Sequence, residues 1–274
     1  MRHGGHGGFP MRGVLQRSAA GLAVLSSAAS LLGDLVYPRH CPLCGIGGGR
    51  GLCPGCCHEV GVDLRNRCGR CGQGAGPHVD ADRVVGCWHC RRRVLSFEGV
   101  ERLGLYEGLL RVACIRGKSG VARPLVWAMG EWFYECRGEA LSGLGVDVVV
   151  PVPQHWTKRI SQPHNQAETL AAVLGRCLRV PMGRHILRKV RRTPDQSSLP
   201  AVSRRANLRD VFCVRRRSGL DGLHVLLVDD ILTTGTTAHQ AARALRRGGA
   251  GGVSVAVLAV VPATADRPSA SSDD

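Results

Sequence analysis

The residues best suited to chemistry are two adjacent carboxylates followed by a hydroxyl-rich turn. The carboxylates are Asp229 and Asp230, which directly follow an apolar run. The turn holds Thr233, Thr234, Gly235, Thr236 and Thr237. Carboxylates accept hydrogen bonds from sugar hydroxyls, whereas threonine hydroxyls and the backbone amides of a helix N-terminus favour a phosphate. The stretch therefore predicts a site that binds a ribose at the acids and its 5′-phosphate at the turn.

This site needs a strand before it and a helix after it, and the sequence predicts both. The apolar run 225–228 is typical of a buried strand, and residues 238–247 are Ala- and Arg-rich before a Gly pair. Further strands are predicted near 100–105, 146–152 and 253–261, and helices over 121–136 and 166–178. This alternation predicts an α/β fold, with a parallel sheet flanked by helices and the ligand at the carboxyl ends of the strands.

Eight of the thirteen cysteines form four Cys-x-x-Cys pairs, which is metal-ligand spacing. They are Cys41, Cys44, Cys53, Cys56, Cys68, Cys71, Cys87 and Cys90. Two pairs complete one closed tetrahedral site, so the spacing predicts two structural zinc ions. Sequential pairing would give two zinc ribbons, and an interleaved cross-brace is the alternative. Redox dithiols, disulfides and iron–sulfur ligation are less favoured readings. Cys57 and His89 lie beside these ligands and are interpreted as bystanders.

The formal net charge of +16 indicates a polyanionic partner or an Arg-rich composition. Basic residues are concentrated between 184 and 217, either as a solvated charged face or as a patch beside a phosphate site. The apolar run 19–33 is too short and too polar for a membrane span. Because the cysteine spacing favours metal over disulfides, we expect the reducing cytoplasm.

The acids and the Thr-Thr-Gly-Thr-Thr turn resemble the phosphoribosyl-diphosphate (PRPP) loop of type I phosphoribosyltransferases. Cysteine pairs followed by such a half resemble the plan of the ComF family over roughly residues 31–261. Besides the PRPP loop, the segments that carry this resemblance are 147–153, 165–171 and 188–207. It implies a type I phosphoribosyltransferase-like domain preceded by a small zinc-ribbon module, and a possible pentosyl transferase activity supported by Asp229 and Asp230.

The resemblance also implies a diphosphate loop over 151–165 and a mobile loop over 188–207. Their candidate residues are Arg159, Asn165, Gln166, Arg188, Gln196 and Arg204. Mg²⁺ would bind with PRPP, because it prefers phosphate oxygens plus one or two carboxylates. Where the family usually has Arg-Gly-Phe-Asn-Gln, residues 162–166 read Gln-Pro-His-Asn-Gln.

We expect disordered residues 1–13, a helix and double zinc module over 14–95, a phosphoribosyltransferase-like domain over 96–262 and a disordered tail over 263–274. Three functions remain open. The first is phosphoribosyl transfer from PRPP to an unknown acceptor. The second is a non-catalytic accessory role, binding single-stranded DNA beside the DNA-uptake machinery of natural competence. The third is PRPP sensing without turnover.

Overall fold

The computed structural model describes residues 40–47, 49, 51–61, 67–74, 86–154, 164–190, 211–215 and 219–263. The helix predicted at the start of the 14–95 module and the disorder predicted for 1–13 lie outside the described residues. So does the tail from 264 onward, whereas Ala263 donates its backbone N–H to Oε1 of Gln73 at 2.9 Å.

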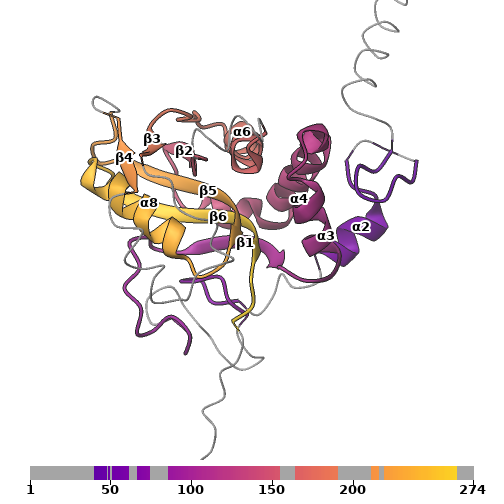
Figure 1. Ribbon diagram of the computed structural model, residues 1–274, viewed down its shortest axis with the longest axis horizontal. Helices are drawn as coiled ribbons and strands as arrows, with labels where there is room; N and C mark the ends of the chain where they lie inside the picture. The colour runs from indigo at the N-terminus through magenta and orange to yellow at the C-terminus, as the bar shows by residue number, and fades with distance from the viewer. Residues whose placement is uncertain are drawn as a thin grey trace, which may run out of the picture.

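Four parallel strands form the central sheet (Figure 1). They are β1 (Val100–Leu105), β2 (Val148–Pro151), β5 (His224–Leu232) and β6 (Gly252–Val260), in the order β1-β6-β5-β2. All three pairings are parallel. The side chains of β6 are buried throughout, as expected for a strand covered on both faces. The parallel α/β fold predicted from the sequence is therefore confirmed.

Helices cover both faces of the sheet. Helices α3 (Gly108–Arg116), α4 (Arg123–Ser142) and α6 (Gln166–Leu178) share one apolar core with Leu226 and Leu258, and the 3₁₀ turn η1 (Gly120–Ala122) joins α3 to α4. Helix α8 (Thr236–Arg247) packs on the opposite core with Val225 and Leu227. Figure 1 shows α4 and α8 on different sides of the strands. Alternate residues of β5 thus pack into two separate cores, which fixes the face of the sheet to which each side chain points.

Several boundaries differ from the predictions. Strand β5 continues to Leu232 and includes both acids, because its pairing with β6 extends to Val260. Helix α8 begins at Thr236 rather than 238, and α4 runs from Arg123 to Ser142 rather than over 121–136. A short antiparallel pair that the sequence did not predict joins β3 (Leu187–Lys189) to β4 (Phe212–Val214). Strands of three residues are too short for an alternation of apolar and polar residues to reveal them in the sequence.

The cysteine segments pack directly on the sheet domain. Helix α2 (Pro54–Val60) and the first four cysteines lie beside α3, with Cys41 and Cys56 inside the shared core. The second group is anchored at β1, where buried Glu101 accepts from Arg67 at 2.7 Å and from Arg137 at 2.9 Å. The cysteine module and the sheet domain are therefore joined by both apolar packing and ion pairs.

Candidate functional site

The two acids lie in β5 just beyond the end of its pairing with β2. The backbone N–H of Asp230 donates to Oδ1 of Asp229 at 2.9 Å, and that of Ile231 donates to Oδ1 of Asp230 at 2.8 Å. Burial raises the pKa of Asp229 well above its ordinary value, and the neighbouring charge of Asp230 adds to this, while Lys189 opposes it. Both side chains keep some exposed surface. The negative charge of the two carboxylates is therefore only partly balanced by nearby groups, and a cation or hydrogen-bond donors from a ligand would stabilise it.

The hydroxyl-rich turn leads straight into α8. Gly235 occupies the N-cap position with φ of 73°, in the left-handed region that favours glycine. The hydroxyls of Thr234 and Thr236 lie 2.8 Å apart, and the N–H of Thr236 donates to the Thr234 hydroxyl at 3.4 Å. Thr233 and Thr237 line the neighbouring cavity. The turn therefore presents two hydroxyls and a helix N-terminus to one space, which is a suitable environment for a phosphate.

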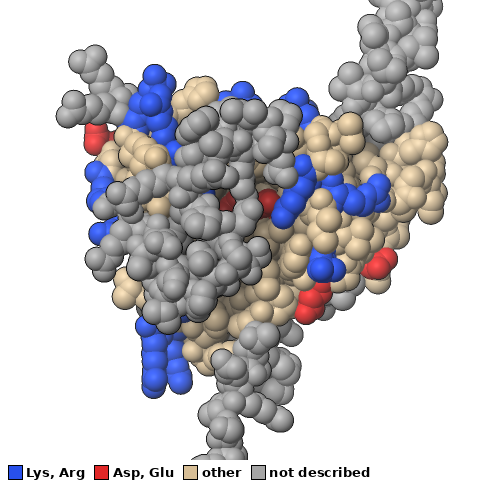
Figure 2. All heavy atoms as spheres, viewed as in Figure 1, with Lys and Arg blue, Asp and Glu red and all other residues tan. Residues whose placement is uncertain are grey.

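That space is a cavity of about 490 Å³ at the carboxyl end of β5. Its polar lining includes Tyr106, Lys118, Gln154, His164, Asn165, Gln166, Lys189, Asp229, Asp230, Thr233 and Thr237. In Figure 2 acidic atoms lie recessed in a hollow of the face drawn, with basic side chains beside it. The predicted acids and two of the four threonines thus meet lysines from other elements, which gives the cavity donors for an anion and acceptors for a sugar.

Several cavity residues were not among the predicted site residues, including Tyr106, Lys118 and Lys189. Tyr106 follows β1 directly, so it stands at the same edge of the parallel sheet as Asp229. Lys118 lies in the turn after α3, and Lys189 ends β3. The position of Tyr106 after a predicted strand was a usable signal. The approach of the two lysines depends on tertiary packing, which no local pattern reports.

Asn165 and Gln166 lie at the cavity but also hold α6 in place. The side chain of Asn165 accepts from the N–H of Ala167 at 3.2 Å and donates to the Val152 carbonyl at 3.3 Å, so it caps α6 and ties it to β2. Gln166 is 3% exposed and donates to the Cys114 carbonyl of α3 at 3.3 Å. Within the described part of the chain, its buried Oε1 has no hydrogen-bond partner.

Among the other predicted diphosphate and mobile-loop residues, the structure describes only Arg188, which does not line the cavity. Arg188 is exposed on β3 and is absent from the cavity lining, because successive strand residues face opposite sides and Lys189 takes the inner one. Arg159, Gln196 and Arg204 lie outside the described residues.

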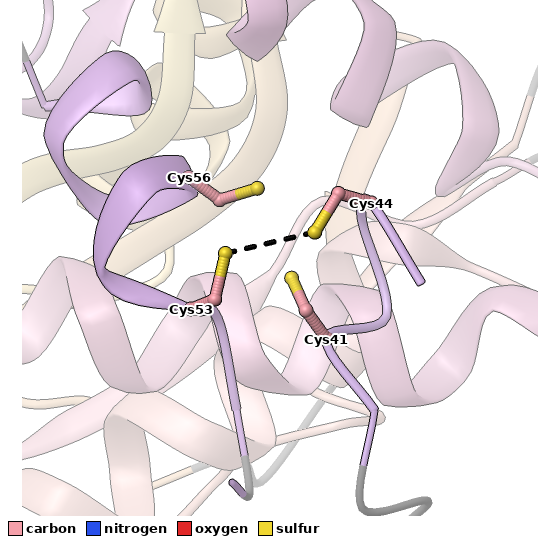
Figure 3. Close-up of side chains that lie close together, drawn as sticks. All are labelled: Cys41, Cys44, Cys53 and Cys56. Atoms are coloured by element: carbon pink, nitrogen blue, oxygen red, sulfur yellow. Dashed lines mark hydrogen bonds between the residues drawn. The ribbon is translucent and has the colours of Figure 1, made fainter. Parts of the chain in front are cut away.

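The eight paired cysteines form two groups of four, Cys41 to Cys56 and Cys68 to Cys90, with the sulfur atoms of each group within 4.8 Å of one another. Figure 3 shows the first four pointing toward a common centre, with the Sγ atoms of Cys44 and Cys53 3.6 Å apart. In the second group, Cys71 and Cys87 are separated by 3.6 Å and Cys68 and Cys90 by 3.7 Å. Zinc–sulfur bonds of about 2.3 Å give tetrahedral sulfur separations of about 3.8 Å. Both groups can bind zinc, with sequential rather than cross-braced pairing.

Neighbouring thiols of the second group shift one another's pKa in opposite directions. A hydrogen bond from Cys71 lowers the pKa of Cys68 to about 4, while the same bond raises that of Cys71. Burial raises the pKa of Cys90 to about 11. Four thiolates so close together need a bound cation, because each charge opposes the next. His89 contacts Arg93, and Cys57 contacts the Leu52 carbonyl, so neither belongs to a cluster.

Comparison with known proteins follows this division of the chain. The Phosphoribosyl transferase domain family matches residues 163–273. Competence protein F of Haemophilus influenzae is 26% identical over 72% of this chain and 85% of its own length. The DNA utilization protein YhgH of Escherichia coli K12 is 34% identical over 40% of this chain, which spans about half of that relative, at 47%.

The chain is thus similar to competence protein F over most of that protein's length. Its two four-cysteine groups precede the region that matches the Phosphoribosyl transferase domain family, as the ComF resemblance implied. Among solved structures, the purine phosphoribosyltransferase of Pyrococcus horikoshii OT3 is 17% identical, with a TM-score of 0.31 over 58% of this chain and 78% of its own. Because this score is low, the fold assignment rests on the domain match and the parallel sheet. Among the described residues, no helix has the length and hydropathy of a membrane span.

Proposed function

We propose that the cavity at the end of β5 binds PRPP, or another 5′-phosphoribosyl group, together with Mg²⁺. The observation that carries this proposal is the convergence of two acids, two threonines and two lysines on one cavity. Its volume of about 490 Å³ lies within the range typical of small-molecule sites. We take the acids as the ribose end and the turn as the 5′-phosphate end.

Each group has a chemical role in this assignment. Asp229 and Asp230 accept from the ribose hydroxyls, and Thr233 and Thr237 donate to the 5′-phosphate together with the first turn of α8. Lys118 and Lys189 supply positive charge for a diphosphate. Mg²⁺, when bound, neutralises the diphosphate, and its preference for oxygen ligands suits the acids.

The same arrangement suits pentosyl transfer. Departure of diphosphate leaves positive charge on the sugar, and the carboxylates of Asp229 and Asp230 stabilise that charge. Tyr106 offers an aromatic ring within the cavity for an acceptor to pack against. Sensing PRPP without turnover requires the same binding site but no productive acceptor position.

Calorimetry with PRPP and Mg²⁺ tests the binding proposal. We expect binding by the zinc-loaded protein and at least a tenfold loss in Asp229→Asn/Asp230→Asn, which keeps the side-chain shape but removes both charges. Asp221→Asn is the matched control, because Asp221 is exposed just before the opposite end of β5. Absence of binding by the folded wild type, or equal binding by the double variant, would refute the proposal. Diphosphate release with a panel of bases then separates transfer from sensing.

A second candidate is binding of single-stranded DNA, as part of DNA uptake or use. The relatives are called competence and DNA utilization proteins, which motivates it. On the second cysteine group, Trp88 is 59% exposed and Arg91 and Arg92 are exposed beside it. An exposed indole among arginines suits base stacking and phosphate contacts.

Single-stranded DNA could bind at the cavity or at Trp88, and these two places give different results with an oligonucleotide. If the strand uses the cavity, a 5′-phosphorylated oligonucleotide binds more tightly than its 5′-hydroxyl form, and PRPP displaces it. If the strand binds only at Trp88, Trp88→Ala weakens binding while PRPP has no effect. A salt titration in both cases reports the number of phosphate contacts. Binding that is undetectable at low salt would remove this candidate.

A further inference from the structure

The second cysteine group is packed against the turn that we assign to the 5′-phosphate. The guanidinium of Arg93, three residues after Cys90, donates to the backbone carbonyl of Thr234. The N–H of Ser96 donates to Nδ1 of His239 in the first turns of α8, at 3.1 Å. Only about 10 Å³ of space remains between the group and the turn. The turn is therefore supported from behind by the cysteine module.

The contact at Thr234 controls the direction of a backbone amide. The peptide unit between Thr234 and Gly235 is planar and trans, so its carbonyl and its N–H point in opposite directions. Because Arg93 holds the carbonyl on the side of the cysteine module, the N–H of Gly235 points away from that module. Gly235 has φ of 73°, and a Cβ built on it would meet nothing within 4 Å, so no packing around a side chain at this position fixes the peptide, whereas the bond from Arg93 does hold its carbonyl.

The position of Arg93 depends in turn on the fold of the cysteine loop. Its own N–H donates to the Cys90 carbonyl at 2.9 Å, and Arg70 donates to the carbonyls of Cys90 and Arg93 at 3.0 and 2.9 Å. Nη1 of Arg93 also lies 3.0 Å from Nε2 of His89. All of these groups lie within three residues of a cysteine of the second group, which a metal ion would hold together.

We propose that Arg93 is a positioning residue that couples the second four-cysteine site to the phosphate-binding turn. A metal in that site keeps Arg93 on the Thr234 carbonyl, and Arg93 keeps the turn in the form that binds a 5′-phosphate. Because coupling of two binding equilibria is reciprocal, ligand in the cavity also slows loss of that metal. This inference rests on the proposed function of the cavity.

Variants at Arg93 and its neighbour test the positioning role. Arg93→Ala removes the hydrogen bond, Arg93→Lys restores one donor, and Arg92→Ala removes an equally charged but exposed side chain. With ribose 5-phosphate as the probe, we expect Arg93→Ala to bind roughly tenfold more weakly, from the strength of a charge-assisted hydrogen bond. Arg93→Lys recovers part of this, and Arg92→Ala matches wild type. Zinc content stays at two per chain in all three, which separates positioning from misfolding.

Amide hydrogen exchange gives a measurement that does not involve the ligand. In the free protein, Arg93→Ala should exchange faster than wild type at the amides of 235–237, while the amides of β6 are unchanged. A variant that had simply lost its fold would exchange faster throughout.

Zinc release to a chelator tests the coupling. Cys44 of the first site is exposed, whereas all four cysteines of the second are buried, so release has a fast and a slow phase. Ribose 5-phosphate should slow only the second phase, and only when Arg93 is present. If wild type binds ribose 5-phosphate and Arg93→Ala binds it equally well, this inference is wrong and the proposed function stands. If wild type binds PRPP but not ribose 5-phosphate, the phosphate role of the turn and this inference are wrong. If wild type binds neither, the proposed function is wrong as well.

Discussion

Replacing Gly235 by alanine tests whether the turn needs a left-handed residue. Gly235 has φ of 73°, and a Cβ built on it meets nothing within 4 Å, so the cost comes from the backbone alone. An alanine in this conformation costs about 1–2 kcal/mol. The loss of glycine's freedom in the unfolded chain offsets about 0.4–1 kcal/mol. We therefore expect a net destabilisation of about 1 kcal/mol.

Two readouts report where this cost appears. If Gly235→Ala keeps the native turn, the melting temperature falls by about 2–4 °C, the shift for 1 kcal/mol in a domain of this size. If the turn relaxes instead, stability is retained and ribose 5-phosphate affinity falls roughly fivefold, the same energy expressed in binding. Asparagine tolerates this region better than alanine, so Gly235→Asn should lie closer to wild type.

A second glycine provides the control. Gly222 has φ of 76° and equally open surroundings, but lies before the start of β5, away from the cavity. Gly222→Ala should lose about the same stability, roughly 1 kcal/mol, with unchanged ligand affinity. Unchanged stability and unchanged affinity in Gly235→Ala would refute the reasoning.

Three further changes follow from the contacts of the site. Because burial raises the pKa of Asp229, its stabilising contribution is complete below the ordinary value and is lost as pH rises through the raised one. Asp229→Asn should therefore raise the melting temperature at neutral pH, and this gain should shrink as the pH is lowered; a lower melting temperature at neutral pH would contradict this. Lys189→Met should weaken Mg²⁺–PRPP more than ribose 5-phosphate by calorimetry, and the exposed Arg188→Met serves as its control. Glu101→Gln leaves two arginines facing an uncharged partner, so urea denaturation should show a loss of about 3 kcal/mol; less than 1 kcal/mol would argue against a structural role for this ion pair.

The sequence predicted best the features that are set by local pattern. Helix α6 begins and ends at the predicted residues, because its apolar face is well segregated and Asn165 caps it. The grouping of eight cysteines into two sites follows from spacing alone, although spacing left the sequential and cross-braced pairings open. The structure decides between them through the packing of each loop, which depends on contacts far apart in the chain.

The two lysines of the cavity could not be predicted from local sequence patterns. Lys118 and Lys189 approach Asp229 only because α3, β3 and β5 pack around one edge of the sheet. The contact of Arg93 with the Thr234 carbonyl spans 141 residues of sequence. Sequence periodicity reports which side of an element is buried, but not which distant partner covers it.

The departure at 162–166 from the usual family pattern can be understood from these contacts. The retained residues, Asn165 and Gln166, cap α6 and reach across to α3, so they preserve the frame of the cavity. A Cβ on Gly117 would lie 2.1 Å from Nε2 of Gln166, which shows how closely the turn carrying Lys118 approaches this helix. Gln166 thus joins α6 to α3, and the turn after α3 brings Lys118 to the cavity. In the binding mode that we propose, Lys118 supplies positive charge for a diphosphate.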